Sequence, residues 1–472
     1  MAALATVTGG NWLGAPPPPE QRITDVCDDS RQVRPGALFA AIRGELADGH
    51  RFLPQALAAG ATALCVEREP DADFQAKLAA ANVPCLLVKD SLRAWQELAR
   101  AHRLRFPQLP VIGITGSCGK TSTKEMIASV LEAHFPGAVL KTEGNTNNHF
   151  GVPRNLFRLG PQHRVAIIEM GTNHPGEIAG LVRLAMPRIG VICNIGHAHL
   201  EYLGDLAGVA REKGALFTGL AALDGGDKIA IYPADSAHVG VLAQLADQAR
   251  KMTVGTAAGA DIRVAYLGAD GRRGYGVRLT WKATGETRDI TWSLGGAHQA
   301  GNAGCAAAVG TALGIPADTI VAGLAACLLP GMRMDIREHA GVHWVNDAYN
   351  SNPDSAHAGV TWFRELTAKA DPLACFLVLG DMRELGPAHA PQAHRELLRL
   401  ALDSCPGYTI VPVGEQMQDA AATCGLRAFP DAASAKAALH PQLTTGAWVL
   451  LKGSRGIQLE KVLPDALAPL AH

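Results

Sequence analysis

Short apolar runs alternate with longer amphipathic stretches through the middle of the chain. The runs at 111–114, 165–170 and 189–194 are each followed by a stretch with helical spacing of its apolar residues. Repeated strand-then-helix alternation predicts a mostly parallel sheet with helices on both of its faces. Between 263 and 292 apolar and polar residues alternate singly around glycine-rich turns, which predicts an antiparallel flap.

The patterns before and after this middle part predict two further α/β domains. Short segments between 23 and 88 predict a small mixed α/β domain, and a helix over 91–105 ends at Phe106-Pro107. After 329, apolar runs separated by helical stretches predict a Rossmann-like, doubly wound domain. These runs lie at 342–345, 375–379, 409–413 and 448–451. We therefore expect α/β domains over 1–106, 107–328 and 329–472.

A glycine-containing turn joins the first apolar run of the middle part to a helical stretch over 122–133. It consists of Thr115, Gly116, Ser117, Cys118, Gly119, Lys120, Thr121 and Ser122. Backbone N–H groups and a helix N-terminus attract an anion there, Lys120 would reach the outer phosphates, and Thr121 would bind Mg²⁺. The generic phosphate loop has an earlier glycine where this chain has Ile114. The turn predicts ATP binding and phosphoryl transfer; a chance glycine-lysine turn is the alternative.

Composition excludes several classes of protein. A net charge of −1 argues against nucleic acid as a partner. The 10 cysteines are scattered, which is typical of reduced thiols in a cytosolic protein. We find neither a signal-peptide pattern nor an apolar window long enough to span a membrane, so we expect a cytoplasmic enzyme without membrane insertion.

Polar side chains follow the other apolar runs. Glu169 ends one run, where open α/β sheets bind ligands, and could complete a magnesium site with Thr121; a solvated acid at a strand end is the alternative. His197 and His199 share strand-like parity after the next run, but no further ligand falls at a spacing that would make a zinc site. Lys213, at an expected helix start, has by itself the pattern of an ordinary solvated lysine.

Three later segments have weaker patterns. His298 and Asn302 are spaced to share one helical face. Residues 346–353 form an Asn- and Asp-rich turn that could cap a helix or face a nucleotide. Lys452 and Arg455 could hold a carboxylate or phosphate, or belong to a simple basic turn.

Taken together, these motifs resemble those of the Mur ligases, the enzymes of peptidoglycan precursor synthesis. The turn at 115–121 is similar to their T-G-x-x-G-K-[ST] form, with Cys118 where Asn or Ser is more usual. Residues 143–153 are similar to the family's G-N-x-N-N-x-x-G-x-P loop, with His149 where an acid is common. Residues 29–50 resemble the uridine-nucleotide domain. The segments 347–353, 380–386 and 452–456 resemble those of the members that add D-alanyl-D-alanine.

The resemblance implies a monomeric, ADP-forming ligase that joins UDP-N-acetylmuramoyl-tripeptide to D-alanyl-D-alanine through an acyl phosphate. It implies catalytic roles for Lys120, Glu169, His199 and Lys213. Two Mg²⁺ ions would be held by Thr121, Glu169, His199 and a carbamate formed from Lys213 and CO₂. ATP would contact residues 115–122, Asn302, Arg333 and Asp347. The substrates would contact Ser30, Arg31, Asn145, Asn147, Asn148, Asn350, Asn352, Lys452 and Arg455.

Three other functions stay open at this point. A sibling Mur ligase that adds a diamino acid usually carries a D-N-P-R-type loop, which this chain lacks. Folylpolyglutamate synthetase shares the ligase core but has no N-terminal domain of the uridine type. A P-loop ATPase acting as a switch would turn over ATP without an amine acceptor.

Overall fold

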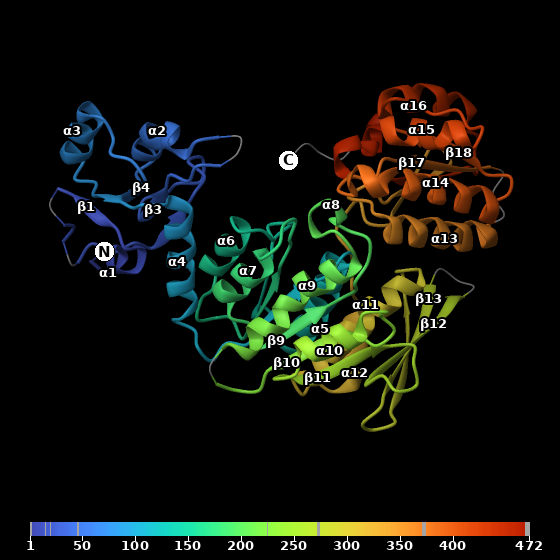
Figure 1. Ribbon diagram of the computed structural model, residues 1–472, viewed down its shortest axis with the longest axis horizontal. Coiled ribbons are helices and arrows are strands. Elements are labelled where there is room, and N and C mark those ends of the chain that lie inside the picture. Colours follow the sequence, from blue (N-terminus) through green and yellow to red (C-terminus); the bar gives the residue numbers. More distant parts are fainter. Residues whose placement is uncertain are drawn as a thin grey trace. The chain divides into compact units, whose positions relative to one another are not determined.

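Strands form three sheets, and helices pack against them (Figure 1). The computed structural model describes residues 2–14, 16–18, 20–44, 47–223, 225–270, 274–370 and 374–467. The chain divides into two compact units. The first comprises Met1–Gly113, Ala138–Gly171 and Ala179–Pro187; the second comprises Ile114–Gly137, Thr172–Ile178 and Arg188–His472.

The first sheet lies in the first unit and has the strand order β1-β5-β4-β3-β2. Only β1 runs antiparallel to its neighbour among these strands. The strands are β1 (Asn11–Leu13), β2 (Asp25–Cys27), β3 (Ala37–Ala40), β4 (Ala63–Val66) and β5 (Cys85–Leu87). The helices are α1 (Ala2–Thr8), α2 (Leu53–Ala58), α3 (Ala72–Ala80), α4 (Ser91–Arg103) and the 3-10 helix η1 (Gly49–Phe52).

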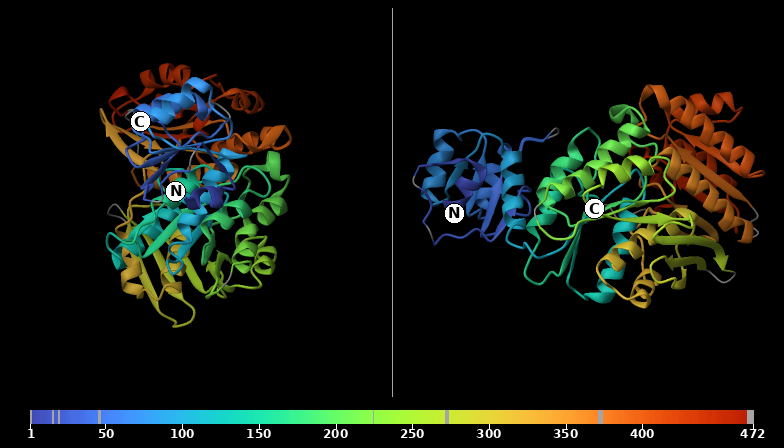
Figure 2. Two further views of the ribbon diagram at one scale, coloured as in Figure 1. Left: turned by 90° about the vertical axis from the view of Figure 1, so that its left-hand side faces the viewer. Right: turned by 60° about the horizontal axis from the view of Figure 1, so that its bottom comes forward.

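Side chains alternate between the two faces of this sheet and build a core on each. Phe39 and Leu64 pack with Phe74 of α3 on one face. Leu38 and Leu86 pack with α4 on the other. The views in Figure 2 show helices on both sides of the blue strands. The predicted small mixed α/β domain is therefore confirmed.

The first unit continues in the parallel pair β7 (Val139–Lys141) and β8 (Val165–Glu169). Helices α6 (Gly151–Phe157) and α7 (Glu177–Ala185) follow β7 and β8, respectively. Strand β6 (Val111–Thr115) is entirely buried and carries the chain from the first unit into the second.

The second sheet is the largest of the three. Its strands in the second unit lie in the order β14-β13-β12-β11-β10-β9. Strands β9 (Ile189–Ile192), β10 (Ile229–Pro233) and β11 (Arg250–Gly255) are parallel. Strands β12 (Ile262–Asp270), β13 (Gly274–Trp281) and β14 (Thr287–Trp292) pair antiparallel, as predicted for the flap, although residues 271–273 lie outside the described part.

Helices of this part of the second unit follow the predicted alternation. They are α5 (Lys120–His134), α8 (Leu200–Leu203), α9 (Leu206–Ala221), α10 (Val239–Leu245), α11 (Ala297–Ala312) and α12 (Ala317–Ala325). Helix α5 packs against α11 and α12, and α9 packs against β9. These contacts fix α5, and with it the helix N-terminus at which the turn after β6 ends.

The third sheet has the order β15-β16-β19-β17-β18, with β15 antiparallel and the others parallel. Its strands are β15 (Asp335–His339), β16 (Val342–Asn346), β17 (Cys375–Gly380), β18 (Thr409–Val413) and β19 (Trp448–Lys452). Its helices are α13 (Pro353–Ala370), α14 (Gly386–Ser404), α15 (Glu415–Thr423) and α16 (Ala432–Leu439), with the 3-10 helices η2 (His440–Gln442), η3 (Arg455–Ile457), η4 (Leu459–Val462) and η5 (Asp465–Leu467).

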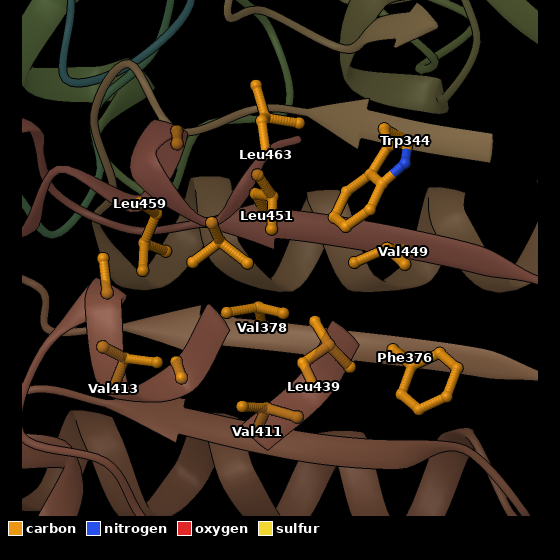
Figure 3. Packing of buried hydrophobic residues seen from close by; sticks show 14 of the residues in the cluster. Trp344, Phe376, Val378, Val411, Val413, Leu439, Val449, Leu451, Leu459 and Leu463 are labelled. Atoms are coloured by element: carbon orange, nitrogen blue, oxygen red, sulfur yellow. The ribbon is translucent and has the colours of Figure 1, made fainter. Parts of the chain in front are cut away.

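Buried apolar side chains fill the space between this sheet and α16. Figure 3 shows Leu439 of α16 among Val378, Val411 and Phe376, which come from neighbouring strands. The doubly wound α/β domain predicted for this part of the chain is confirmed. The edge strand β15 was not predicted.

Two local expectations are wrong. Lys213 lies in the interior of α9, because this helix begins at Leu206, where the Asp205 side chain accepts a hydrogen bond from the Gly208 N–H at 2.7 Å. His197 and His199 do not share a strand, because β9 ends at Ile192. In the part of the chain that the structure describes, no helix combines the length and apolarity needed to cross a membrane.

Candidate active site

The turn between β6 and α5 has the backbone geometry of an anion-binding loop. Gly119 is the N-cap of α5 and has φ +78°, a conformation that favours glycine. A β-carbon there would lie 2.7 Å from Oδ1 of Asn302. Glycine is therefore needed at residue 119 for both backbone conformation and space, directly before a helix N-terminus of the kind that attracts anions.

The chain after β9 holds this turn in place. The Cys118 N–H donates to Oδ1 of Asn194 at 2.9 Å, and Nδ2 of Asn194 donates to the Cys118 Sγ at 2.6 Å. Ser117 Oγ donates to the Gly196 carbonyl and accepts from the Gly196 N–H, each at 2.9 Å. The thiol that replaces the family's usual Asn or Ser thus has a hydrogen-bonding role within the loop.

The side chains of Lys120 and Thr121 both form hydrogen bonds within the protein. Lys120 Nζ donates to the Gly116 carbonyl at 2.8 Å, within the turn. Nη2 of Arg333 donates to the Thr121 Oγ1 at 3.0 Å, and the Arg333 guanidinium lies 4.0 Å from the centre of the Tyr349 ring. The structure therefore brings Arg333 to the loop, whereas the contact with ATP that the resemblance implies for it is not tested.

Asn302, in α11, packs against the loop and the start of α5. Its Oδ1 accepts from the Thr123 hydroxyl at 3.2 Å, and its Nδ2 donates to Oε1 of Gln299 at 2.9 Å. The side chain is buried. The structure thus places Asn302 against Gly119 and Thr123, whereas its predicted contact with ATP is not tested.

Lys213 is buried in the interior of α9. Its side chain is 0% exposed, and no described group hydrogen-bonds its Nζ. Burial, and to a lesser degree repulsion by Lys120, lower the pKa of this amine to about 7. A substantial fraction of Lys213 is therefore neutral and nucleophilic near neutral pH.

The neighbouring Glu212 organises the chain that follows β8. Its carboxylate accepts from the Gly176 N–H at 2.7 Å, the Ile178 N–H at 2.9 Å and the Thr172 hydroxyl at 3.3 Å. Residues 172–178 and Glu212 belong to the same unit. Glu212 thus anchors this segment to α9 beside Lys213.

His199 contacts a carboxylate from the third sheet's part of the chain. Its Nδ1 lies 2.9 Å from Oε2 of Glu384. Burial lowers the pKa of His199, and the nearby charges of Lys213 and Lys120 act in the same direction against the favourable contact with Glu384. Burial alone would raise the pKa of Glu384, but His199, Lys120 and Lys213 outweigh it, so that its pKa is below the ordinary value.

In the first unit, Glu169 ends β8 and is buried. Its Oε1 accepts from Nδ2 of Asn147 at 2.8 Å, and its N–H donates to the Thr142 hydroxyl at 2.9 Å. The buried Nδ2 of Asn155 bonds the carbonyls of Thr146 and Gly151, which braces the loop that carries Asn147. The structure therefore joins the predicted Glu169 to the predicted asparagine loop.

The other asparagines of this loop have local roles. Asn148 Oδ1 accepts from the N–H groups of Phe150 and Gly151, at the start of α6. The Asn145 carbonyl accepts from the Asn147 N–H at 2.8 Å. These contacts shape the loop and do not test its predicted contact with substrate.

Predicted residues near the third sheet gather around Lys452, which is buried at the end of β19. Its Nζ lies 3.0 Å from Oδ2 of Asp347 and donates to the Asn350 carbonyl at 2.8 Å. Asn352 caps the start of α13 through the Ser355 N–H, with its Nδ2 3.5 Å from the Ser117 carbonyl. Arg455 stands apart from them and pairs with Glu460 at 3.1 Å.

Ser30 and Arg31 lie in the first unit. Ser30 Oγ donates to Oε1 of Gln55 at 2.9 Å. Arg31 is largely exposed and forms a two-point ion pair with Asp29. These contacts leave the Arg31 guanidinium at the surface.

Three residues that support the site had no assigned role from sequence. Asn194 lies shortly before His197 and His199, Glu384 lies within the segment 380–386, and Glu212 directly precedes Lys213. Their roles depend on contacts with distant segments, which spacing alone does not reveal.

The donor set suits magnesium better than a transition metal. Across residues 2–467, gaps in the described ranges excepted, no three His, Cys, Asp or Glu side chains gather at metal-binding distance. Magnesium is commonly held by one or two carboxylates together with water and substrate phosphates. The Thr121 hydroxyl and the buried Glu169 carboxylate, each in its own unit, are oxygen donors of this kind, whereas the Lys213 amine would become one only as a carbamate.

Comparisons with known proteins agree with this geometry. The family models called Mur ligase family, catalytic domain; Mur ligase middle domain; and Mur ligase, glutamate ligase domain match residues 22–103, 114–310 and 332–455. Together they span most of the chain and include the loop at 115–121, Lys213 and Glu384.

Relatives resemble the chain over nearly its full length. The UDP-N-acetylmuramoyl-tripeptide–D-alanyl-D-alanine ligase of Escherichia coli is 35% identical, over 98% of this chain and 97% of the relative. The ligase of the same name from Synechocystis is 34% identical, over 95% and 92%. A crystal structure of MurF from Acinetobacter baumannii has a TM-score of 0.86 and 30% identity, covering 98% of this chain and 97% of the other. The chain belongs to the Mur ligase family.

Proposed function

We propose that the protein is an ATP-dependent ligase that joins D-alanyl-D-alanine to UDP-N-acetylmuramoyl-tripeptide in peptidoglycan precursor synthesis. The observation that carries the proposal is the match, from end to end, with relatives that bear this activity in their names. The products are UDP-N-acetylmuramoyl-pentapeptide, ADP and phosphate. We expect the enzyme to act as a monomer in the cytoplasm.

The loop at 115–122 binds the ATP phosphates in this proposal. Lys120 leaves the Gly116 carbonyl and turns to the β- and γ-phosphates, while the first N–H groups of α5 donate to their oxygens. Arg333 approaches the phosphates from its place beside Thr121. Asn302 keeps the loop in shape, and Asp347, held by Lys452, faces the ribose.

Thr121, Glu169, His199 and a carbamate on Lys213 would hold two Mg²⁺ ions. The bound ions would supply positive charge that neutralises the phosphates during transfer. The neutral Lys213 amine attacks CO₂, forms an N–C bond and releases one proton, and the resulting carbamate is an anion. The burial of its Nζ without a partner supports this modification, because a permanent ammonium there would be costly.

We assign the segments 1–106, 107–328 and 329–472 to the UDP-linked substrate, to ATP and to the dipeptide, respectively. Ser30 and Arg31 contact the UDP-linked substrate, and Asn145, Asn147 and Asn148 lie along its path. Asn350, Asn352, Lys452 and Arg455 face the dipeptide.

Amide formation then takes two substitutions. The terminal carboxylate of the tripeptide attacks the γ-phosphorus, and the bond to ADP breaks, leaving an acyl phosphate. The amine of D-alanyl-D-alanine attacks the acyl carbon, loses a proton, and phosphate leaves. Lys120 and the loop N–H groups stabilise the charge that develops on the phosphate oxygens. Exclusion of water protects the acyl phosphate.

One assay separates this function from its rivals. We expect ADP release to require both UDP-linked tripeptide and D-alanyl-D-alanine, with the pentapeptide found by mass spectrometry. A ligase for a diamino acid would need UDP-linked dipeptide instead. A folylpolyglutamate synthetase would need a folate, and an ATPase switch would release ADP with no acceptor at all.

The substitution Lys120→Ala tests the assignment of the phosphate loop. We expect it to abolish ADP release while the thermal unfolding curve stays close to that of the wild type, because Lys120 bonds only one loop carbonyl. Undiminished ADP release would contradict the assigned role of this lysine.

A further inference from the structure

The chain after β17 forms a loop, residues 381–386, that is pinned at three successive residues. Asp381 accepts from the Met417 N–H at 2.8 Å at the start of α15. The Met382 N–H donates to Nε2 of the buried His394 at 2.8 Å. The Arg383 N–H donates to Ser454 Oγ at 2.9 Å. The backbone leading to Glu384 is therefore held from three separate elements.

Glu384 itself adopts a backbone conformation that is unfavourable for its type. Its φ is +68°, and the φ of His199, which its carboxylate contacts, is +57°. Two contacting residues other than glycine in the left-handed region are uncommon, and such strain concentrates at functional sites. At the end of the loop, a β-carbon on Gly386 would lie 3.2 Å from Cβ of Glu201, in the helix that follows His199. The loop therefore fits closely against α8.

We propose that Glu384 is a positioning residue that orients the His199 ring for metal binding. The carboxylate faces Nδ1, so that Nε2, for which the structure describes no hydrogen bond, is the nitrogen left for a ligand. Histidines that bind metals almost always donate their other N–H to a carboxylate, carbonyl or water. This inference rests on the proposed function, in which His199 is a magnesium ligand.

The contact has the distance of a hydrogen bond but not yet its direction. Nδ1 lies 2.9 Å from Oε2, yet the geometry leaves Nδ1 without an aligned acceptor. Hydrogen bonds at active sites are often misaligned before ligands bind and become aligned in the loaded complex. We infer that metal and nucleotide draw the ring into line with Glu384, which couples the 381–386 loop to the catalytic centre.

The surroundings distinguish this pair from an ordinary surface ion pair. The His199 side chain is 12% exposed and that of Glu384 45%, and Lys120 and Lys213 are close enough to act on both members of the pair. A second pair of the same residue types, His343 and Glu338, lies 3.9 Å apart on β15 and β16, with the glutamate 62% exposed. Glu338 therefore provides a matched control.

The test compares Glu384→Gln and Glu384→Ala with Glu338→Gln and the wild type. Mn²⁺ affinity is measured by electron paramagnetic resonance with ADP present, which requires no turnover. We expect both Glu384 variants to bind Mn²⁺ about 10- to 100-fold more weakly, the range for loss of an outer-shell partner. Glu338→Gln should match the wild type. Thermal unfolding identifies any variant that fails to fold. Glu384→Gln changes only a partly exposed side chain and leaves the contacts of residues 381–383 in place.

The tautomer of His199 is a second readout. In protein with ¹⁵N-labelled histidine, NMR spectra of the two-bond ¹H–¹⁵N couplings show which ring nitrogen carries the proton. The His199 signals are assigned as those that are lost in His199→Asn. We expect the proton on Nδ1 in the wild type and on Nε2 in Glu384→Ala. Unchanged Mn²⁺ affinity in both folded Glu384 variants overturns the inference, whatever the tautomer. If the wild type releases ADP at the same rate with and without D-alanyl-D-alanine, the proposed function is contradicted instead.

Discussion

The carboxamide of Asn302 occupies the space that a β-carbon at residue 119 would need, with Oδ1 2.7 Å from that position. The same carboxamide is fixed by Thr123 and Gln299, so it cannot move aside without loss of two hydrogen bonds. A helix far along the chain therefore sets the shape of the phosphate loop.

From this we expect Gly119→Ala to destabilise the protein and to weaken ATP binding. Steric overlap with Asn302 and a φ of +78° both oppose the alanine, and overpacking of this kind costs about 1–3 kcal/mol. Urea unfolding and calorimetric titration with ATP measure the two effects. Gly301→Ala is the control: its β-carbon meets open space within α11, so that alanine should stabilise by about 0.5–1 kcal/mol.

The buried amine of Lys213 predicts dependence of activity on CO₂. Depletion of bicarbonate should lower the turnover of the wild type, and added bicarbonate should restore it. Below a pH of about 7 the amine is increasingly protonated and cannot attack CO₂, so the restoration should weaken. Lys213→Ala should be inactive, and short carboxylic acids should partly restore it. Wild-type turnover in Lys213→Ala would rule out the carbamate.

The same amine predicts a pH-dependent stability difference between the wild type and Lys213→Met. The pKa of Lys213 falls from 10.5 to about 7 on folding, so the unfolded chain binds the proton more tightly between these values. In CO₂-free buffer the methionine variant should be more stable, by at most about 5 kcal/mol near pH 7. The gap should narrow as pH rises towards 10.5. Urea unfolding across this range checks it; a gap that does not vary with pH contradicts it.

Local pattern was enough for some of these features and not for others. The strand, turn and helix around residues 115–121 could be predicted because they follow one another within a few residues. Strand β15 was missed because four of its five residues are polar or charged and it lies exposed at a sheet edge. The burial of Lys213 depends on tertiary packing around α9. Neighbouring residues in the sequence do not specify it, so the lysine looked ordinary.

Glu212 illustrates a role that only the structure reveals, and it predicts a loss of stability. Glu212→Ala removes the acceptor of the Gly176 and Ile178 N–H groups. Stranding two partly or fully buried donors should cost about 2–4 kcal/mol in urea unfolding. Glu177→Ala, whose carboxylate accepts from the N–H groups of Asn173 and His174 at a more exposed site, should cost less, about 0.5–1 kcal/mol. Equal losses in the two variants would argue against the anchoring role of Glu212.

The thiol of Cys118 predicts which substitutions the phosphate loop tolerates. Its Sγ accepts from Nδ2 of Asn194, and a serine hydroxyl can accept the same bond, whereas valine cannot. We expect Cys118→Ser to keep the KM for ATP within about threefold of the wild type, a change of less than about 1 kcal/mol. Cys118→Val leaves the Asn194 amide without its acceptor and should raise KM by about tenfold, or about 1.4 kcal/mol. Steady-state kinetics with varied ATP measure both. If the valine variant matched the serine variant, the bond from Asn194 Nδ2 to the residue 118 side chain would have no part in holding the loop, whose shape would then depend on its other contacts, the Cys118 N–H bond to Asn194 and the Ser117–Gly196 pair among them.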